Sequence, residues 1–154
     1  MGISIRWRSW NGLSKKELYD LIQLRLAVFC VEQNCPYQDL DGLDKLAMHL
    51  LAYDDGKLVG YLRLFESLEQ YHGLASIGRV CTESAYRGKG LARDMMQLAL
   101  SYSDQNFAKN IKISAQHYLE DFYSSLDFVT VTEPYLEDGI PHIGMIRQYE
   151  DNDV

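Results

Sequence analysis

Apolar and polar residues repeat with two different periods along this chain, and the change of period separates expected strands from expected helices. At the start, Ile3, Ile5 and Trp7 alternate with polar residues. A period of two is typical of a strand with one buried face, so a strand is expected over residues 3–8.

The first predicted helix opens with a capping box. Ser14 supplies an N-cap hydroxyl, and Glu17 stands three residues later, where its carboxylate can reach back to the N-cap amide. The residues that follow at helical spacing are Leu18, Leu21, Ile22, Arg25 and Phe29. Together these signals predict a helix over residues 14–30.

The remaining pattern predicts strands that are mostly joined by hairpins. Strands are expected over residues 47–53, 58–65, 75–81, 111–115, 128–132 and 142–149. Helices are expected from residue 91 and over residues 118–126, a loop or short helix over 36–44, and a loop over 137–141. Residues 54–57 form a hairpin turn, and residues 150–154 are expected to be a frayed tail.

This order of elements favours an α+β fold, layered α/β/α. Crossover helices occur only around the middle strand, so a mixed, mostly antiparallel sheet of about seven strands with about four helices is expected. The chain contains no repeat, no low-complexity tract and no linker that would divide it. We therefore expect residues 1–154 to form a single domain.

The stretch from residue 75 to 101 holds the strongest functional signal. A short strand leads through a polar turn into a glycine-bearing basic loop over residues 87–92, which runs directly into a helix. The first turn of a helix has unpaired N–H groups and a partial positive charge. Gly88 and Gly90 would let a phosphate approach those N–H groups, while Arg87 and Lys89 add full charges.

The spacing of this loop excludes two familiar phosphate-binding loops. A P-loop requires Ser or Thr after Gly-Lys, but Lys89 is followed by Gly90. A dinucleotide fingerprint requires a third small residue where Arg93 stands. The pattern Arg-x-x-Gly-x-Ala, from Arg87 to Ala92, instead resembles the pyrophosphate loop of the GCN5-related N-acetyltransferases, the GNAT superfamily.

Net charge and cysteine content limit the classes of binding partner and the cellular compartment that can be expected. The formal net charge is -7 and the isoelectric point is near 5.0, which disfavours a nucleic-acid binder and suits a cationic substrate such as an amine. The chain has an odd number of cysteines, Cys30, Cys35 and Cys81, and Cys30 and Cys35 lack the spacing of a zinc-binding pair. Reduced thiols in a cytoplasmic protein are therefore expected. No targeting segment, membrane span or metal site is expected from the pattern.

Three further stretches resemble the ElaA-like branch of the GNAT superfamily. They are VFCVEQ over residues 28–33, AQHYL over residues 115–119 and DGIPHI over residues 138–143. With the glycine loop, the resemblance extends roughly from Trp7 to Met145. One departure is Asp127, where the family usually has Gly at the end of a short helix; Asp also tolerates the left-handed conformation.

The resemblance implies the GNAT acyl-CoA N-acyltransferase fold and direct transfer of an acetyl group from acetyl-CoA to a primary amine in a ternary complex. The implied cofactor-binding residues are Val80, Cys81, Thr82, Arg87, Gly88, Lys89, Gly90, Leu91, Ala92 and Tyr118. Main-chain N–H groups near Val80 to Thr82 would stabilise the carbonyl oxygen. Tyr123 would act as the acid for the departing thiolate.

The base and the acceptor remain open at this level. Glu32, Glu83, His117 and His142 are candidate bases, of which His117 would act as the catalytic residue if it faces the cleft. Glu32, Gln33 and His142 are expected on the acceptor side. Small-molecule and peptide amines both remain possible acceptors, and both a monomer and a homodimer remain possible.

Two alternative functions are compatible with the same pattern. The first is an acyl-homoserine-lactone-synthase-like enzyme, although the Arg-x-x-Gly-x-Ala loop favours CoA over an acyl-carrier protein. The second is a catalytically silent domain that binds acyl-CoA as a sensor or partner module.

Overall fold

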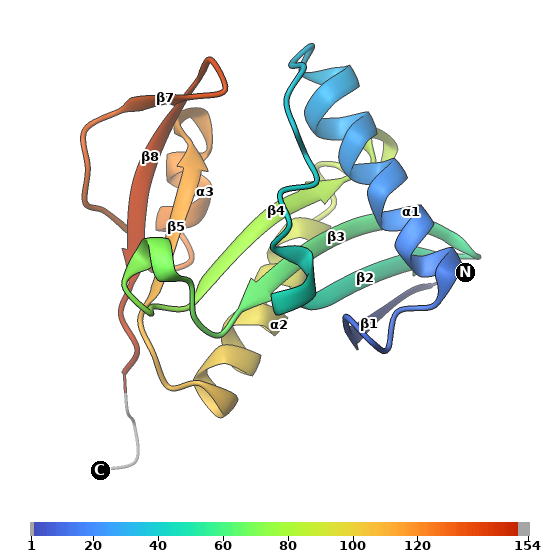
Figure 1. The fold of residues 1–154 in the computed structure, drawn as a ribbon, viewed down its shortest axis with the longest axis horizontal. Coiled ribbons are helices and arrows are strands. Elements are labelled where there is room, and N and C mark those ends of the chain that lie inside the picture. Colours follow the sequence, from blue (N-terminus) through green and yellow to red (C-terminus); the bar gives the residue numbers. More distant parts are fainter. Residues whose placement is uncertain (1, 151–154) are drawn as a thin grey trace.

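Two sheets that part from one another organise the fold (Figure 1). The computed structural model describes residues 2–150. The first sheet has the order β1-β2-β3-β4, and the second has β5-β8-β6 with β7 paired to β8. The strands are β1 (Ile3–Ser9), β2 (Met48–Asp54), β3 (Lys57–Phe65), β4 (Ser76–Thr82), β5 (Ile111–Gln116), β6 (Val129–Thr130), β7 (Tyr135–Glu137) and β8 (Ile140–Arg147). All pairings inside the two sheets are antiparallel.

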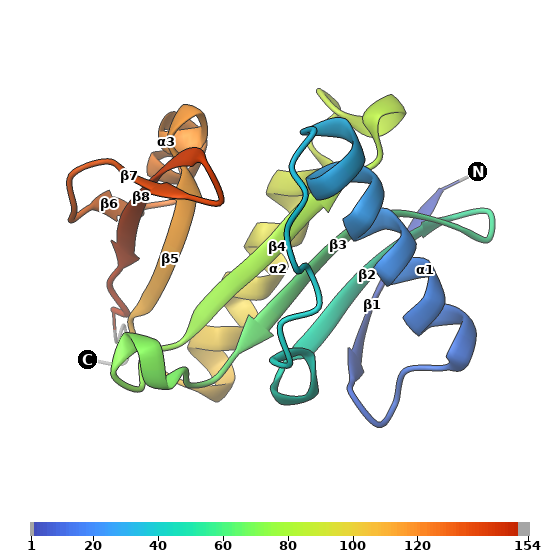
Figure 2. The ribbon, with the colours of Figure 1, turned by 45° about the horizontal axis from the view of Figure 1, so that its top comes forward.

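The two sheets meet at one end of β4 and β5. A parallel bridge joins Ala75 to Ile111, with hydrogen bonds from Ala75 N to Asn110 O (3.2 Å) and from Lys112 N to Ala75 O (2.9 Å). Beyond this point β4 and β5 belong to different sheets and diverge in both ribbon views (Figures 1 and 2). The main chains of β4 and β5 are therefore not hydrogen-bonded to each other toward the C-terminal end of β4, which leads into the glycine loop.

Helices cover both faces of the first sheet (Figure 2). Helix α1 (Lys15–Arg25) packs on one face and α2 (Leu91–Asn106) on the other, so adjacent residues of β2 enter different cores. Leu51 packs with Leu21 of α1, whereas Leu50 belongs to the larger core that includes Met95 of α2. A short third helix, α3 (Glu120–Ser124), packs against the second sheet. No helix within residues 2–150 is both long and apolar enough to cross a bilayer.

The predicted capping box is confirmed, but the first helix ends differently from the prediction. Glu17 N donates to Ser14 Oγ (3.0 Å), and Ser14 N donates to Glu17 Oε1 (2.9 Å). After Arg25 the chain continues as a π-helical segment, Leu26–Glu32, rather than as an α-helix. Segments of π-helix are rare in proteins, and those that occur are often found at functional sites.

Two local predictions about turns agree with the structure. Asp55 and Gly56 both have positive φ (50° and 83°), as a two-residue hairpin turn requires. Asp127 adopts φ 72° after α3, so it takes the left-handed conformation in place of Gly.

The second sheet departs most from the predicted elements. The strand expected over residues 128–132 is reduced to β6, and β7 was missed because its three exposed residues carry no alternating pattern. The chain has β1 to β8 within residues 2–150 rather than about seven strands. A 3-10 turn, His117–Leu119, begins the expected helix over residues 118–126. Of the expected tail, residues 151–154 lie outside the described residues.

Candidate active site

A cavity of about 970 Å³ lies where β4 and β5 part. Its walls include both sheets, the π-helical segment, the loop that follows it, and α3. Most of the residues expected at the site from sequence line it, namely Glu32, Gln33, Val80, Cys81, Thr82, Arg87, Ala92, Tyr118, Tyr123 and His142. Gly88, Lys89, Gly90, Leu91 and His117 are not among its lining residues.

A β-bulge interrupts β4 at the cavity wall. Tyr61 pairs with Cys81, but Arg63 pairs with Gly78, so two residues of β4 stand opposite Leu62. One of them, Arg79, has φ 50°, which is unusual for a residue with a side chain. Such bulges re-aim the chain and are frequent beside active sites. No local pattern in the sequence predicts this bulge, although the functional amides are expected at or beside it, near Val80 to Thr82.

The glycine loop has the conformation that its glycines permit. Gly88 and Gly90 have φ of 75° and 82°, and Gly90 is the N-cap of α2. A Cβ at either position would meet no other atom within 4 Å, so space is open above both residues. Leu91 instead turns its side chain into the core, where it is 6% exposed. That side chain therefore anchors the loop, and any contact of Leu91 with a ligand must come from its main chain.

Arg87 connects the glycine loop to the end of the π-helical segment. Its guanidinium donates to both carboxylate oxygens of Glu32, at 2.5 and 2.9 Å, and to Thr82 O at 2.9 Å. Lys89 lies over the ring of Tyr86, 5.6 Å from its centroid. Glu32, expected on the acceptor side, is thus engaged by the proposed phosphate loop instead.

Tyr123 lies at the inner wall of the cavity. Its ring packs edge-on against Phe122 and Phe128, with centroid distances of 5.1 and 5.9 Å, and the residue is 8% exposed. Burial raises the pKa of Tyr123 above its ordinary value, with a smaller contribution from Tyr118, so the phenol stays protonated at neutral pH. Its hydroxyl has no hydrogen-bond partner among the described residues. Tyr118 differs sharply, since it is 75% exposed at the rim.

Cys81 is a buried thiol in the wall of the cavity. Burial raises the pKa of Cys81 to about 12. The thiolate is the nucleophilic form of cysteine, so this side chain is poorly suited to covalent catalysis at neutral pH.

The candidate bases differ in position. His117 has its Nε2 atom 3.8 Å from Glu120 Oε1 and is not among the residues that line the cavity. Glu83 caps a 3-10 turn, Ser84–Tyr86, by accepting the Ala85 amide hydrogen at 3.2 Å, and it also does not line the cavity. His142 does line the cavity and is 7% exposed. The structure therefore brings His142, but neither His117 nor Glu83, to the site.

Two contacts join opposite walls of the cavity. The side-chain amides of Gln33 and Gln116 bond reciprocally, with nitrogen–oxygen distances of 3.1 and 3.5 Å. Nearby, Cys35 Sγ donates to Asp138 O at 3.4 Å. The end of the π-helical segment and the loop after it are thus attached to the second sheet at the mouth of the site.

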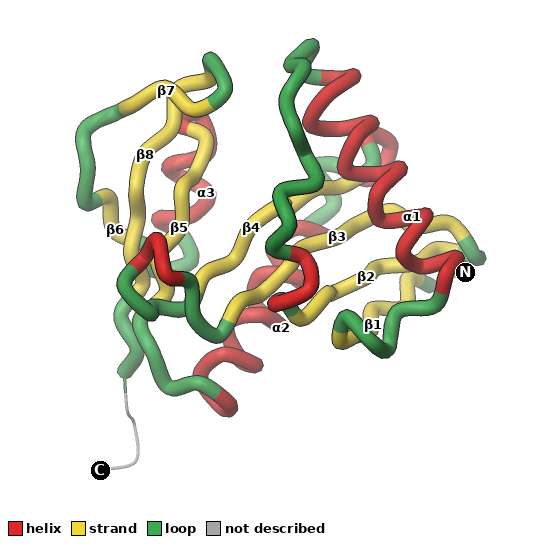
Figure 3. Tube along the Cα trace, in the orientation of Figure 1, coloured by secondary structure: helices red, strands yellow, loops and turns green. Residues whose placement is uncertain are grey.

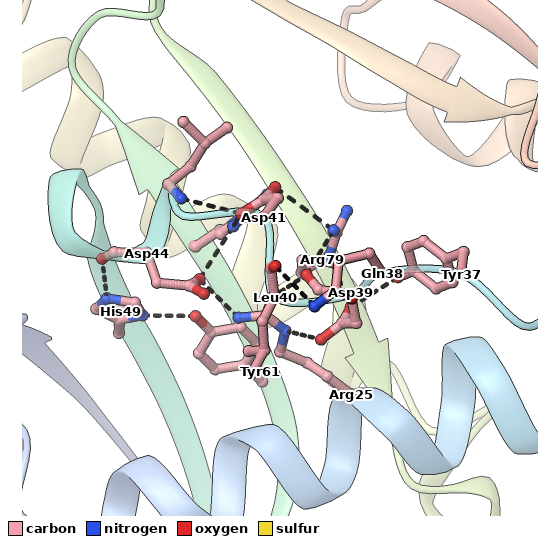
Figure 4. Close-up of polar contacts among 12 residues, drawn as sticks. Arg25, Tyr37, Gln38, Asp39, Leu40, Asp41, Asp44, His49, Tyr61 and Arg79 are labelled. Carbon is pink, nitrogen blue, oxygen red and sulfur yellow. Dashed lines mark hydrogen bonds and ion pairs between the residues drawn. The ribbon is translucent and has the colours of Figure 1, made fainter.

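A buried arginine–aspartate network holds that loop, residues 33–43, against the first sheet (Figures 3 and 4). Arg25 is 0% exposed and donates to Asp39 Oδ2 (2.9 Å), Asp39 O (2.9 Å) and Asp44 Oδ1 (2.6 Å). Arg63 donates to the same Asp44 oxygen at 3.0 Å and to both oxygens of Asp41, at 2.6 and 2.9 Å. Each buried charge therefore has a partner of opposite sign.

The same network reaches the bulge. Arg79 donates to Asp39 O at 2.9 Å, and its Nε atom lies 2.9 Å from Asp39 Oδ1. Tyr37 O–H donates to that Asp39 oxygen at 2.6 Å. The loop and the bulged strand are consequently tied together, which offsets the backbone strain at Arg79.

The buried His49 and the more exposed Asp41 complete the network. His49 contacts Tyr61 Oη at 2.5 Å through Nδ1 and Asp44 O at 2.9 Å through Nε2, and burial lowers the pKa of His49 (Figure 4). Burial alone would raise the pKa of Asp41, but hydrogen bonds from Arg63 hold that pKa well below its usual range. Within residues 2–150 no three His, Cys, Asp or Glu side chains are grouped so as to hold a metal ion.

Comparison with known proteins identifies close relatives over nearly the whole chain. The profile of the acetyltransferase (GNAT) domain matches residues 18–148. Protein ElaA of Escherichia coli (strain K12) is 44% identical over 149 residues, which cover 94% of this chain and 97% of that protein. The crystal structure of Escherichia coli ElaA superposes with a TM-score of 0.89 at 40% identity, covering 96% of this chain and 100% of the other. An acyl-CoA N-acyltransferase from Pseudomonas aeruginosa superposes with a TM-score of 0.88 at 45% identity, covering 95% and 99% of the two chains.

Proposed function

This chain belongs to the GNAT acetyltransferase family, and from that premise we propose that it transfers an acetyl group from acetyl-CoA to a primary amine, which attacks the thioester directly in a ternary complex. The observation that carries the proposal is one continuous cavity. This cavity is lined by the bulged part of β4, by the side chain of Arg87 beside the glycine loop, and by Tyr123. The Pseudomonas aeruginosa relative, an acyl-CoA N-acyltransferase, supports an acyl-CoA donor.

The pyrophosphate of the donor would bind at the head of α2. Open space above Gly88 and Gly90 fits a phosphate close to the main-chain N–H groups of residues 87–92. Arg87 adds a charge at the rim of the cavity, where it now pairs with Glu32. Because a helix of 16 residues begins here, the positive end of its dipole also favours an anion.

The carbonyl oxygen of the thioester would accept a hydrogen bond from a main-chain N–H between Val80 and Thr82. The bulge supports this role, because Val80 is one of the two β4 residues that stand opposite Leu62, where the pairing of β3 with β4 is interrupted. A fixed donor of this kind stabilises the charge that develops on oxygen in the transition state.

Tyr123 would protonate the departing thiolate of CoA. Burial keeps its phenol protonated, and the hydroxyl has no competing hydrogen-bond partner among the described residues. Cys81, with its raised pKa, would remain a thiol in the strand, which fits direct attack better than an acetyl-cysteine intermediate.

A screen for CoA release tests this function. The wild-type protein is incubated with acetyl-CoA and a panel of primary amines, and free thiol is measured alongside the melting temperature with acetyl-CoA alone. Release that depends on an amine supports an N-acetyltransferase. A higher melting temperature without any release indicates a silent acyl-CoA-binding domain, and release only from an acyl-carrier-protein donor indicates the lactone-synthase-like alternative.

A further inference from the structure

Four polar side chains gather on the wall formed by β5, β7 and β8, and their role is not explained by the donor site. They are Ser114, Tyr135, Glu137 and His142, called here the β7–β8 cluster. Ser114, Glu137 and His142 line the cavity. Tyr135 stacks on the His142 ring, with centroids 6.3 Å apart. Register explains the grouping, since Tyr135 is paired with His142, and His142 with Gln116.

The cluster lies on the face of the second sheet opposite Tyr123. Ile113 and Ala115 of β5 point into the core that contains Tyr123, so Ser114 and Gln116 point to the other face. Gln116 bonds to Gln33 at the end of the π-helical segment, which places this face on the α1 side of the cleft. The cavity therefore has Tyr123, the proposed proton donor, at one side of the parted strands and the cluster at the other.

A chain of hydrogen bonds orients the carboxylate of the cluster. Ser114 Oγ donates to Glu137 Oε1 at 3.1 Å. Since the serine hydrogen is used there, Tyr135 O–H donates to Ser114 Oγ, at 2.5 Å. Glu137 Oε2 remains directed toward the His142 ring, with an oxygen–Nε2 distance of 3.4 Å.

The other nitrogen of His142 determines what Nε2 can do. Nδ1 lies 2.7 Å from Ile140 O, and a carbonyl oxygen only accepts, so Nδ1 carries the hydrogen. In the neutral ring Nε2 then presents a lone pair toward Glu137. His142 Nε2 and Glu137 Oε2 are then two hydrogen-bond acceptors 3.4 Å apart, and neither atom carries a hydrogen to donate to the other. The N–H groups of a cation can donate to both.

Among the described residues, the carboxylates beside the pair are not matched by a Lys or Arg, although Lys112 lies on the same face of the sheet, beside Gly144. No Lys or Arg within residues 2–150 forms an ion pair with Glu137, and the neighbouring Asp138 also lines the cavity without an ion-pair partner in that range. By contrast, Asp41 and Glu32 in the same cavity are matched by Arg63 and Arg87. The only uncompensated carboxylates in the described lining are thus at the β7–β8 turn.

We propose that the β7–β8 cluster binds the ammonium group of the acceptor and that His142 Nε2 removes its proton, so that the preferred acceptors are cationic alkylamines without a carboxylate of their own. This inference rests on the proposed function and assigns its acceptor site. Glu137 is the positioning residue, because it holds the ammonium beside Nε2 and then pairs with the imidazolium.

The proton balance uses both sides of the cleft. The ammonium gives one proton to His142 Nε2, and the freed lone pair forms the C–N bond to the thioester carbon. The C–S bond breaks, and the thiolate takes the proton of Tyr123. The second nitrogen proton returns to the Tyr123 phenolate through water, and His142 releases its proton to solvent. One proton is released overall for each acetyl group transferred.

The test compares single variants with matched controls. His142→Asn keeps an amide donor near Ile140 O but removes the base, and its control is His72→Asn, at an exposed left-handed position where Asn is tolerated. Glu137→Gln is compared with Glu133→Gln, an exposed position. The acceptors are n-butylamine and 1,4-diaminobutane, and CoA release gives kcat and KM.

His142→Asn should lower kcat at least about 100-fold with little change in KM, as expected for loss of a general base. Glu137→Gln should instead raise the amine KM about tenfold or more. Both controls should stay within about threefold of wild type. A further variant, His142→Ala, should regain turnover when imidazole is added, which a purely structural histidine would not show. Melting curves establish that each variant is folded.

Several outcomes would overturn the inference. The first is a kcat of His142→Asn within threefold of the wild-type value. The second is a His142→Ala variant whose turnover imidazole does not restore. The third is a wild-type protein that acetylates neither amine and whose CoA complex is not stabilised by either amine in melting curves. Acetylation of aspartate but of neither cationic amine would leave the proposed function standing and refute this acceptor site. Absence of acetyl-CoA binding would refute the proposed function itself.

Discussion

The guanidinium of Arg87 forms a two-point ion pair with the carboxylate of Glu32, with nitrogen–oxygen distances of 2.5 and 2.9 Å. The pair spans 55 positions of sequence and joins the end of the π-helical segment to the first residue of the glycine loop. Both side chains are about 40% exposed (40% for Arg87, 42% for Glu32), so solvent screens their attraction. An incoming pyrophosphate would compete with Glu32 for the same guanidinium.

We therefore expect Glu32→Gln to tighten acetyl-CoA binding rather than weaken it. The gain should be at most about fivefold, because exposed ion pairs contribute roughly 0–1 kcal/mol. Thermal stability should change little for the same reason. Isothermal titration of acetyl-CoA into wild type, Glu32→Gln and the exposed control Glu133→Gln would measure the change in affinity. Weaker binding by Glu32→Gln would show that Glu32 does not compete for Arg87.

Gly90 offers a test of the pyrophosphate loop. Gly90→Glu should abolish measurable acetyl-CoA binding, because its side chain would occupy the open space above the helix start and repel phosphate. Gly56→Glu is the matched control, since Gly56 has nearly the same φ (83° against 82°) and also has open space, but lies in a hairpin turn. Both changes should cost about 1–2 kcal/mol of stability. Equal acetyl-CoA binding by the two variants would contradict the loop assignment.

Removal of the Tyr123 hydroxyl should slow chemistry while leaving donor binding intact. Tyr123→Phe should lower kcat by about tenfold or more, since general acid catalysis typically contributes about 10²–10⁴-fold and the leaving thiolate is a weak base. The ring still packs between Phe122 and Phe128, so the melting temperature should hardly change. Tyr118→Phe, at the exposed rim, is the comparison, and a larger loss there would move the acid to Tyr118.

Cys81 should be dispensable for turnover. Its pKa of about 12 keeps it a thiol, so Cys81→Ala should retain most of kcat and lose about 1 kcal/mol of stability from the buried strand. Double-reciprocal plots of initial rates should intersect, as for a ternary complex. Parallel lines, or an acetylated Cys81 detected by mass spectrometry, would indicate a covalent intermediate instead.

The arginine–aspartate network should make the fold sensitive to acid. Because the pKa of Asp41 in the folded protein lies below the unfolded value of about 4, its stabilisation is complete at neutral pH and is lost as pH falls below about 4. Because Asp41 is partly exposed and solvent screens its ion pair, Asp41→Asn should cost about 1 kcal/mol at neutral pH, and less as the pH approaches the folded pKa. Urea denaturation at several pH values would measure this; an equal cost at every pH would exclude linkage to Asp41.

Short-range features of this protein were predictable from sequence because each depends on neighbouring residues. The Ser14–Glu17 capping box, the hairpin turn at Asp55 and Gly56, and the glycine loop before α2 all satisfy their own backbone within a few positions. The same local reading predicts an anion loop over residues 87–92. Tyr123 was expected at the site from the family resemblance, and it lines the cavity.

Tertiary structure alone decided which of the candidates share a site. His142 meets Glu137 and Ser114 only through the pairing of β8 with β7 and β5, whereas His117, equally plausible in sequence, lies outside the cavity. The bulge had no local signal either, since Arg79 is held left-handed by Asp39, 40 positions earlier. Strand register and buried ion pairs are set by contacts between distant segments, and the pattern along a single segment does not contain them.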